Sequence, residues 1–190
     1  IAPRCDVAIM RRLCLAAAAA FTHAAFRLPA APTVSSALSV ATAAFETSCV
    51  PEAALSAEYL LTRAAGFGND RGALSRNGQD VLSIEAKCEF ERMCAMRLER
   101  TPVQYILGDW DFHDLTLALR PPVLIPRPET EELVEHVLQA HARPEREAEA
   151  ARTFLDVGCG SGAIGLALLH SLSDSTCVAI DVSAEAVALA

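Results

Sequence analysis

A glycine-rich turn with two acidic residues near it is the part of this sequence best suited to chemistry. Residues 158–162 read GCGSG and stand between two apolar stretches, residues 153–157 and residues 163–172. A strand, a glycine turn and a helix in this order present backbone N–H groups at the positive end of a helix, where glycine lets a ligand approach. Asp181 lies 19 residues beyond Gly162, at the end of a second apolar run. A carboxylate there can accept hydrogen bonds from a ribose diol, so the pattern predicts a site for a ribose-containing cofactor.

Two classes of cofactor fit this pattern. Residues 160–165 satisfy GxGxxG, the weak signature of dinucleotide-binding enzymes. The fuller string starts at Asp156, two residues before the first glycine, and resembles the first motif of S-adenosylmethionine-dependent methyltransferases. In those enzymes the loop carries the methionine end of the cofactor, and the acid after the second strand holds the ribose. A dinucleotide oxidoreductase and a glycine turn without a ligand are the alternatives.

Two strings farther upstream favour the methyltransferase interpretation and narrow the family. Residues 100–108 read RTPVQYILG, and residues 123–131 read VLIPRPETE. Together with the glycine loop and Asp181, they resemble the HemK/PrmC family, the peptide chain release factor glutamine methyltransferases, which has an organellar branch. The resemblance covers about residues 36–190. It implies methyl transfer from S-adenosyl-L-methionine to the side-chain amide nitrogen of the glutamine in a release factor's Gly-Gly-Gln tripeptide.

The resemblance also assigns site residues. Cofactor-binding residues are expected at Gly158, Cys159, Gly160, Ser161, Gly162 and Asp181. Asp156 either faces the cofactor or holds the loop through hydrogen bonds, and both roles stay open. Arg127 and Thr130 are candidates for the border of the same pocket, because Pro126 and Pro128 stiffen their turn. No metal site is expected.

The catalytic element that the family implies does not occur in these residues. An amide nitrogen is a poor nucleophile, and the family meets this with an Asn-Pro-Pro-Tyr tetrapeptide, which is absent from residues 1–190. Two parallel strands alone cannot bury both of their faces. We therefore expect a fragment of a longer enzyme, with no catalytic residue in this chain and no activity by itself. A non-catalytic fragment that docks on a release factor and a nucleic-acid adenine N-methyltransferase are the alternatives.

Composition and charge limit the partners. The chain has 190 residues and a mass of 20.2 kDa, and it is 52% hydrophobic and 21% charged, which is typical of a globular protein. Its longest apolar run, residues 13–21, is far below the roughly 20 residues of a membrane span. Residues 46–190 carry 12 basic and 23 acidic groups, a net charge of -11. Such a surface repels a phosphate backbone, so direct nucleic-acid binding is not expected.

The first residues have the composition of a targeting segment. Arg11 and Arg12 follow Met10, and no acidic residue stands between Met10 and Glu46. An arginine-bearing, serine-bearing, acid-poor leader predicts a mitochondrial transit segment over residues 1–35 and a matrix location, and Met10 is a candidate for the true start. A secretory signal, a disordered alanine-rich tail and a cytoplasmic location are the alternatives.

Seven scattered cysteines without a CxxC pair predict neither a zinc site nor a disulfide framework. We expect them to act as small buried hydrophobic residues in a reducing compartment.

The elements that position the loop follow from periodicity. Residues 36–100 are expected to form a helical docking domain whose last helix, residues 84–100, buries Ile84, Cys88, Ala95 and Leu98. Residues 101–122 alternate in polarity and predict a β-hairpin linker. Residues 123–190 are the start of a methyltransferase domain, with a helix from Pro128 that Pro144 and the charged run 145–152 close. The fold class is α/β, a Rossmann-like methyltransferase domain present only in its first part, preceded by a small helical bundle and the hairpin.

Overall fold

The computed structural model describes residues 26–141 and 152–190, and the chain divides into two compact units, Ile1–Ile106 and Leu107–Ala190. The predicted transit segment up to residue 25, with Met10, lies outside the described residues, and so do Pro144 and most of the run 145–152. Among the described residues, no helix combines the length and the apolar character that a bilayer span requires.

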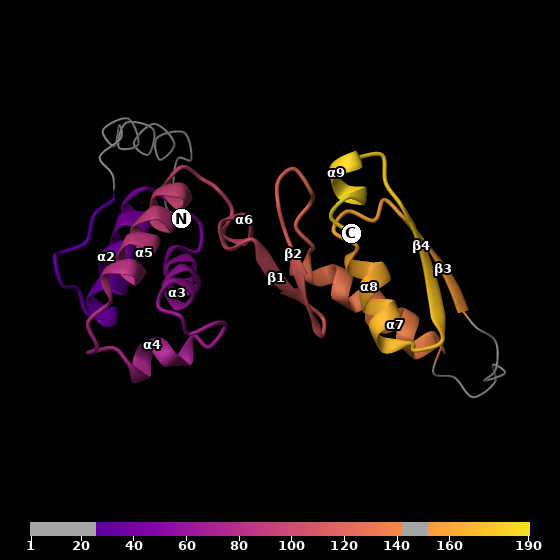
Figure 1. Ribbon diagram of the computed structural model, residues 1–190, viewed down its shortest axis with the longest axis horizontal. Helices are drawn as coiled ribbons and strands as arrows, with labels where there is room; N and C mark the ends of the chain where they lie inside the picture. Colours follow the sequence, from indigo (N-terminus) through magenta and orange to yellow (C-terminus); the bar gives the residue numbers. More distant parts are fainter. Residues whose placement is uncertain (1–25, 142–151) are drawn as a thin grey trace, which may run out of the picture. The chain divides into compact units, whose positions relative to one another are not determined.

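The first unit is helical. Its helices are α2 (Val34–Thr47), α3 (Ala53–Ala64), α4 (Gly72–Arg76), α5 (Ile84–Leu98) and α6 (Val103–Leu107), the last of which ends one residue beyond the unit. Figure 1 shows α2, α3 and α5 side by side. Serine and threonine caps start two of them: the side chain of Thr33 accepts from the N–H of Ser36, and that of Ser83 accepts from the N–H of Ala86. The core between the helices contains Ala37, Ala41, Phe45, Leu60, Leu61 and Phe90.

The buried face of α5 differs from the prediction. Ile84 is 77% exposed and Cys88 is also exposed, so the predicted stripe is wrong at its first two positions. The buried apolar residues are Phe90, Met93 and Cys94. Helical spacing allows either stripe, and packing decides between them, because the ring of Phe90 meets the ring of Phe26 edge to face at 6.4 Å between centroids.

The cysteines correct a second expectation. Cys49 is disulfide-bonded, whereas we expected free thiols throughout. Cys88, Cys94, Cys159 and Cys177 are free. Cys94 is fully buried in the first unit, and this burial raises the pKa of its thiol, so it behaves there as the small hydrophobic residue we predicted.

The buried carboxylate of Glu91 on α5 forms hydrogen bonds with the segment that precedes α2. The side chain of Glu91 is only 5% exposed and accepts the N–H of Leu28 at 2.7 Å and the guanidinium of Arg27 at 2.8 Å. The N–H of Leu82 donates to the carbonyl of Pro32 at 3.0 Å. Residues 26–35, which we assigned to the transit segment, thus belong to the packed helical unit.

Replacing Glu91 by alanine is expected to destabilise this unit by about 1–3 kcal/mol, because the buried N–H of Leu28 loses its acceptor. Glu89→Ala is the matched control on the same helix. Glu89 pairs with Arg92 in a solvent-exposed ion pair, whose loss costs about 1 kcal/mol or less. Urea unfolding monitored by circular dichroism measures both, and equal effects of the two substitutions would contradict the role of Glu91.

The same carboxylate gives a pH dependence. Burial favours the neutral form of Glu91, but the N–H of Leu28, the guanidinium of Arg27 and the charge of Lys87 outweigh it and hold the pKa below its usual value. The unfolded chain therefore takes up this proton at a higher pH than the folded chain. The stabilisation is complete above the unfolded-state pKa and is lost as the pH falls through the folded-state pKa. The Glu91→Ala variant should lack this part of the acid-induced loss of stability.

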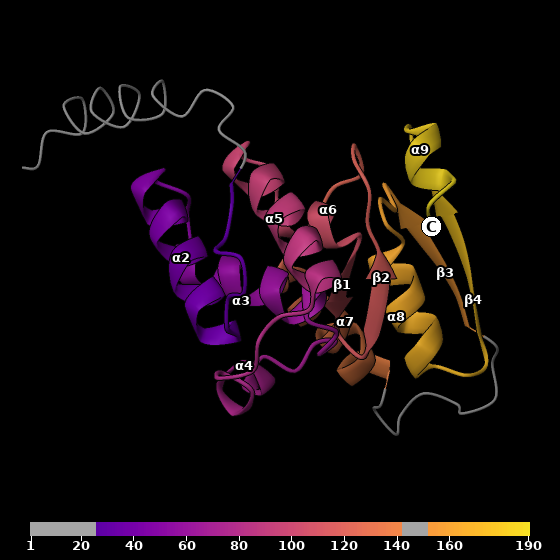
Figure 2. The ribbon, with the colours of Figure 1, turned by 60° about the vertical axis from the view of Figure 1, so that its left-hand side comes forward.

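The second unit combines a hairpin, two helices and a parallel strand pair. Its elements are β1 (Asp109–Phe112), β2 (Leu115–Ala118), α7 (Pro128–His141), β3 (Arg152–Val157), α8 (Ala163–Ser171), β4 (Ser175–Ile180) and α9 (Ala184–Val187). β1 and β2 are antiparallel, with Phe112 opposite Leu115. β3 and β4 are parallel, with Val157 opposite Ile180 at their carboxyl ends. Figure 2 shows this pair extending beside α8.

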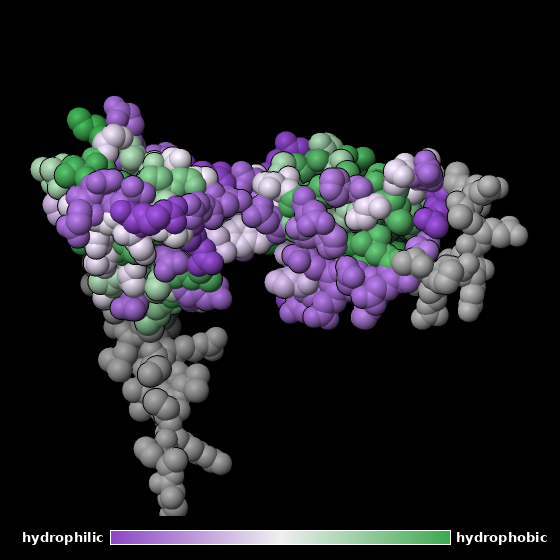
Figure 3. All heavy atoms as spheres, turned by 90° about the horizontal axis from the view of Figure 1, so that it is seen from below, coloured by the Kyte–Doolittle hydropathy of each residue, from purple (hydrophilic) through white to green (hydrophobic). Residues whose placement is uncertain are grey.

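One core joins the hairpin to the helices. It contains the buried residues Phe112, Leu117, Val134, Ala163, Ala167 and Leu168, and Phe154 of β3 packs against them. The opposite face of the strand pair presents four exposed apolar side chains, Leu155, Val157, Val178 and Ile180. Figure 3 shows hydrophobic residues that reach the surface among hydrophilic ones. The predicted fold class, a partial Rossmann-like α/β domain with a preceding helical region and hairpin, is confirmed.

Candidate functional site

The glycine loop connects the carboxyl end of β3 to the start of α8. Gly158 and Gly162 adopt φ values of +80° and +77°, a region that other residues enter only at a cost. The N–H groups of Gly158 and Cys159 both donate to the carbonyl of Ile180, at 2.8 and 3.1 Å. The loop is therefore attached to the end of β4 and lies at the carboxyl ends of both parallel strands, the usual place for ligands of such sheets.

Two carboxylates hold the loop from its two sides. Asp181, directly after β4, accepts the N–H of Gly160 at 2.9 Å with one oxygen and the N–H of Ser183 at 2.9 Å with the other. Hydrogen bonds from the N–H groups of Ser183 and Gly160 hold the pKa of Asp181 below its usual value. Asp156 of β3 accepts the N–H of Gly165 at 3.1 Å.

The field at the loop is negative. Burial raises the pKa of the Cys159 thiol, and the carboxylates of Asp181 and Asp156 raise it further. A raised pKa keeps this thiol protonated, so it is a poor nucleophile at neutral pH.

Ser161 has two donors that remain for a ligand. This residue is only 5% exposed. Within residues 26–141 and 152–190, neither its N–H nor its hydroxyl has a hydrogen-bond partner, although the N–H groups of Gly158, Cys159, Gly160 and Gly162 are all paired.

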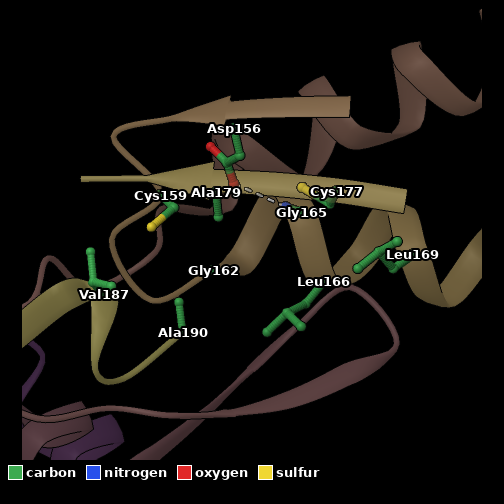
Figure 4. Close-up of a pocket in the computed structure, with 10 residues that line it drawn as sticks. All are labelled: Asp156, Cys159, Gly162, Gly165, Leu166, Leu169, Cys177, Ala179, Val187 and Ala190. Atoms are coloured by element: carbon green, nitrogen blue, oxygen red, sulfur yellow. Dashed lines mark hydrogen bonds between the residues drawn. The ribbon is translucent and has the colours of Figure 1, made fainter. Parts of the chain in front are cut away.

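A pocket of about 200 Å³ opens next to the loop (Figure 4). Asp156, Cys159 and Gly162, all predicted site residues, line it, whereas Gly158, Gly160, Ser161 and Asp181 are not among its lining residues. The lining that sequence reasoning missed comprises Gly165, Leu166 and Leu169 of α8, Cys177 and Ala179 of β4, and Val187 and Ala190. Leu166 and Leu169 are three residues apart and share one face of α8, and Cys177 and Ala179 are two residues apart and share one face of β4. Periodicity could therefore have indicated them. The pocket thus lies between α8 and β4, with Cys159 and Gly162 of the glycine loop among its lining residues.

The Pro-Arg-Pro turn is separate from this pocket. Pro128 begins α7, and the N–H of Thr130 donates to the carbonyl of Arg127 at 2.9 Å in the first turn. Arg127 is exposed and Thr130 is half-buried, and neither lines the pocket. The structure does not bring these two predicted border residues together with the glycine loop.

Gly162 offers a direct test of the loop geometry. Gly162→Ala is expected to destabilise the second unit by about 1–2 kcal/mol, the cost of a Cβ in the left-handed region. The new Cβ would also lie 3.2 Å from a methyl carbon of Leu166. Gly78→Ala is the control, because Gly78 has no positive φ and its nearest neighbour would be 3.4 Å away. In thermal unfolding, Gly162→Ala should lower the melting temperature, and Gly78→Ala should change it less or in the opposite direction. An unchanged melting temperature for Gly162→Ala would contradict the geometry.

Comparisons with known proteins agree with this geometry. Residues 36–108 match the PrmC N-terminal domain, and residues 130–190 match the methyltransferase small domain. The chain is 44% identical over 153 residues to the MTRF1L release factor glutamine methyltransferase of Homo sapiens, covering 78% of this chain and 44% of that protein. It is 39% identical over 141 residues to the release factor glutamine methyltransferase of Geobacter sulfurreducens, covering 74% of this chain and 46% of that one. The chain spans about half the length of the curated relatives it matches.

A parallel strand pair with a glycine loop and an acid after the second strand, in a region that matches the methyltransferase small domain, defines a domain of the methyltransferase class. The match of residues 36–108 to the PrmC N-terminal domain narrows this class to one family. The family predicted from the sequence, HemK/PrmC, is thereby confirmed.

Proposed function

We propose that this protein belongs to the machinery of translation termination and methylates the glutamine side-chain amide in the Gly-Gly-Gln motif of a peptide chain release factor. The observation that carries the proposal is the glycine loop held between Asp156 and Asp181 at the ends of two parallel strands. The names of two relatives, one human and one bacterial, support the substrate.

S-adenosyl-L-methionine is the proposed cofactor, and it would supply a methyl group on a positively charged sulfur. The match of residues 130–190 to the methyltransferase small domain favours this cofactor over a dinucleotide. A carboxylate has about four acceptor positions. Asp181 uses two of them on backbone N–H groups and keeps capacity for the ribose hydroxyls. The free N–H and hydroxyl of Ser161 can donate to the carboxylate of the methionine end.

The role of these residues is to bind and orient rather than to react. When bound, the cofactor would supply the methyl group and keep the electron pair of the broken sulfur–carbon bond, while the amide nitrogen would gain the methyl group and release its proton to solvent. The groups that the family uses to orient the amide are in an Asn-Pro-Pro-Tyr string that residues 1–190 do not contain. The described residues therefore provide the cofactor end of the reaction.

The other parts of the chain receive roles within the same proposal. Residues 36–100 would dock the release factor, residues 101–122 would form the hairpin linker and residues 123–190 would begin the catalytic domain. The part of the predicted leader that precedes the packed residues 26–35 would direct the protein to the mitochondrial matrix, which the acid-free composition between Met10 and Glu46 supports.

The test is a methylation assay with the full-length protein, S-adenosylmethionine and a release factor. Mass spectrometry should find one added methyl group on the Gly-Gly-Gln peptide, and none when that glutamine is replaced by alanine. Absence of methylation, together with protection of the protein against heat by a nicotinamide dinucleotide, would overturn the proposal in favour of an oxidoreductase.

A further inference from the structure

The carboxylate of Asp156 lines the pocket, but its hydrogen bond points into the protein (Figure 4). We propose that Asp156 is a positioning residue, which fixes the start of α8 to β3 and thereby sets the shape of the glycine loop, without itself binding the cofactor through its charge. This inference rests on the proposed function, because it specifies how the same site is kept ready for its ligand.

The first argument comes from helix capping. The first N–H groups of a helix have no partner within the helix and need an external acceptor. α2, α5 and α9 each begin with a serine or threonine whose side chain supplies one. α8 begins after Gly162, which has no side chain to do so. The carboxylate of Asp156 takes this place from a neighbouring strand, because it accepts the N–H of Gly165, the third residue of α8.

The second argument comes from the space around Gly165. A Cβ at this position would lie 3.3 Å from the Asp156 carboxylate and 3.0 Å from the sulfur of Cys177. Both contacts are tighter than ordinary van der Waals separations. A glycine in the first turn of α8 therefore allows the carboxylate to come close enough to accept the hydrogen bond.

The third argument concerns the remaining donors. Asp181 and the carbonyl of Ile180 pair the N–H groups of Gly158, Cys159 and Gly160 from the side of β4. Asp156 pairs Gly165 from the side of β3. Hydrogen bonds thus hold the loop at both ends in the absence of a ligand. In the described part of the chain, the N–H and hydroxyl of Ser161 have no partner and can bind that ligand. Such preorganisation lowers the ordering cost of binding.

The experiment separates an acceptor role from a charge role. The affinity of the full-length protein for S-adenosylmethionine is measured by isothermal titration calorimetry for the wild type, Asp156→Asn and Asp156→Ala. The amide oxygen of asparagine can accept the same N–H, so Asp156→Asn should stay within about threefold of the wild type, and Asp156→Ala should bind about tenfold or more weakly. Asp174→Ala, an exposed acid of the same unit, should have no effect.

Amide hydrogen exchange without cofactor provides a second readout. The N–H of Gly165 should be protected in the wild type and in Asp156→Asn, and should exchange faster in Asp156→Ala. Equal losses of affinity in the asparagine and alanine variants would overturn the inference, since they would assign the role to the negative charge. Unchanged affinity in Asp156→Ala would overturn it as well. A wild type that does not bind S-adenosylmethionine would instead overturn the proposed function, so the two failures are distinguishable.

Discussion

Replacing Asp181 by alanine is expected to weaken S-adenosylmethionine binding by the full-length protein about 10- to 100-fold, the usual size for hydrogen bonds to a charged group. Two losses combine in this variant. The ribose hydroxyls lose their proposed acceptor, and the N–H of Gly160 loses the partner that holds the loop at 2.9 Å. Calorimetric titration of the cofactor measures the effect.

The control for this prediction is again Asp174→Ala, which removes one negative charge from an exposed position of the same unit. It should leave the affinity unchanged, which separates the local role of Asp181 from a general effect of charge. The pH provides a further check. Because backbone N–H groups lower the pKa of Asp181, the affinity should persist into mildly acidic solution and decline only as the pH falls through that lowered pKa. Wild-type affinity in Asp181→Ala would show that this acid does not hold the cofactor.

Replacing Phe112 by alanine is expected to destabilise the second unit by about 3–5 kcal/mol, the range for removing a buried aromatic ring. The ring is 1% exposed and belongs to the core shared by the hairpin, α7 and α8. Its removal leaves a cavity between the hairpin and the helix that carries the glycine loop. Urea unfolding of the full-length variant, followed by fluorescence, gives the change in the free energy of unfolding.

Leu124→Ala is the matched control for the Phe112 variant. Leu124 belongs to the same unit but is 69% exposed, so its truncation should change the free energy of unfolding by about 0.5 kcal/mol or less. A similarly small effect at Phe112 would mean that the hairpin does not pack into the core of this unit, contrary to the structure.

Local sequence patterns predicted the parts of the site that depend on local geometry. The step from an apolar strand to a glycine turn and a helix follows from the residues between 153 and 172, and the structure places β3, the loop and α8 there. Ser183 stands directly before α9, and its hydroxyl accepts the N–H of Ala186 at 3.1 Å, as serine does at the start of many helices. Such features involve neighbours in the chain, so a single sequence contains the information for them.

Features that depend on distant neighbours were not predictable in the same way. The buried face of α5 is set by Phe26, which lies 64 residues before Phe90, and the hydrogen bonds of Glu91 reach back to Arg27 and Leu28. Helical spacing allowed either of two faces of α5 to be buried. Only the packing of the segment before α2 decides between these two faces. The disulfide at Cys49 also has no local signature, because pairing depends on which residues meet in space.

The role of Asp156 shows the same limit at the site itself. Its position two residues before the first glycine fits both a contact with the cofactor and a contact with the loop. Only the distance of 3.1 Å to the N–H of Gly165 identifies the partner that it has in the structure.

The most direct single measurement is a calorimetric titration of the full-length protein with S-adenosylmethionine and, in parallel, with a nicotinamide dinucleotide. The match to the methyltransferase small domain and the acid two residues before the first glycine predict that S-adenosylmethionine binds and that the dinucleotide does not. Binding of the dinucleotide without binding of S-adenosylmethionine would contradict the assignment of this loop to a methyltransferase.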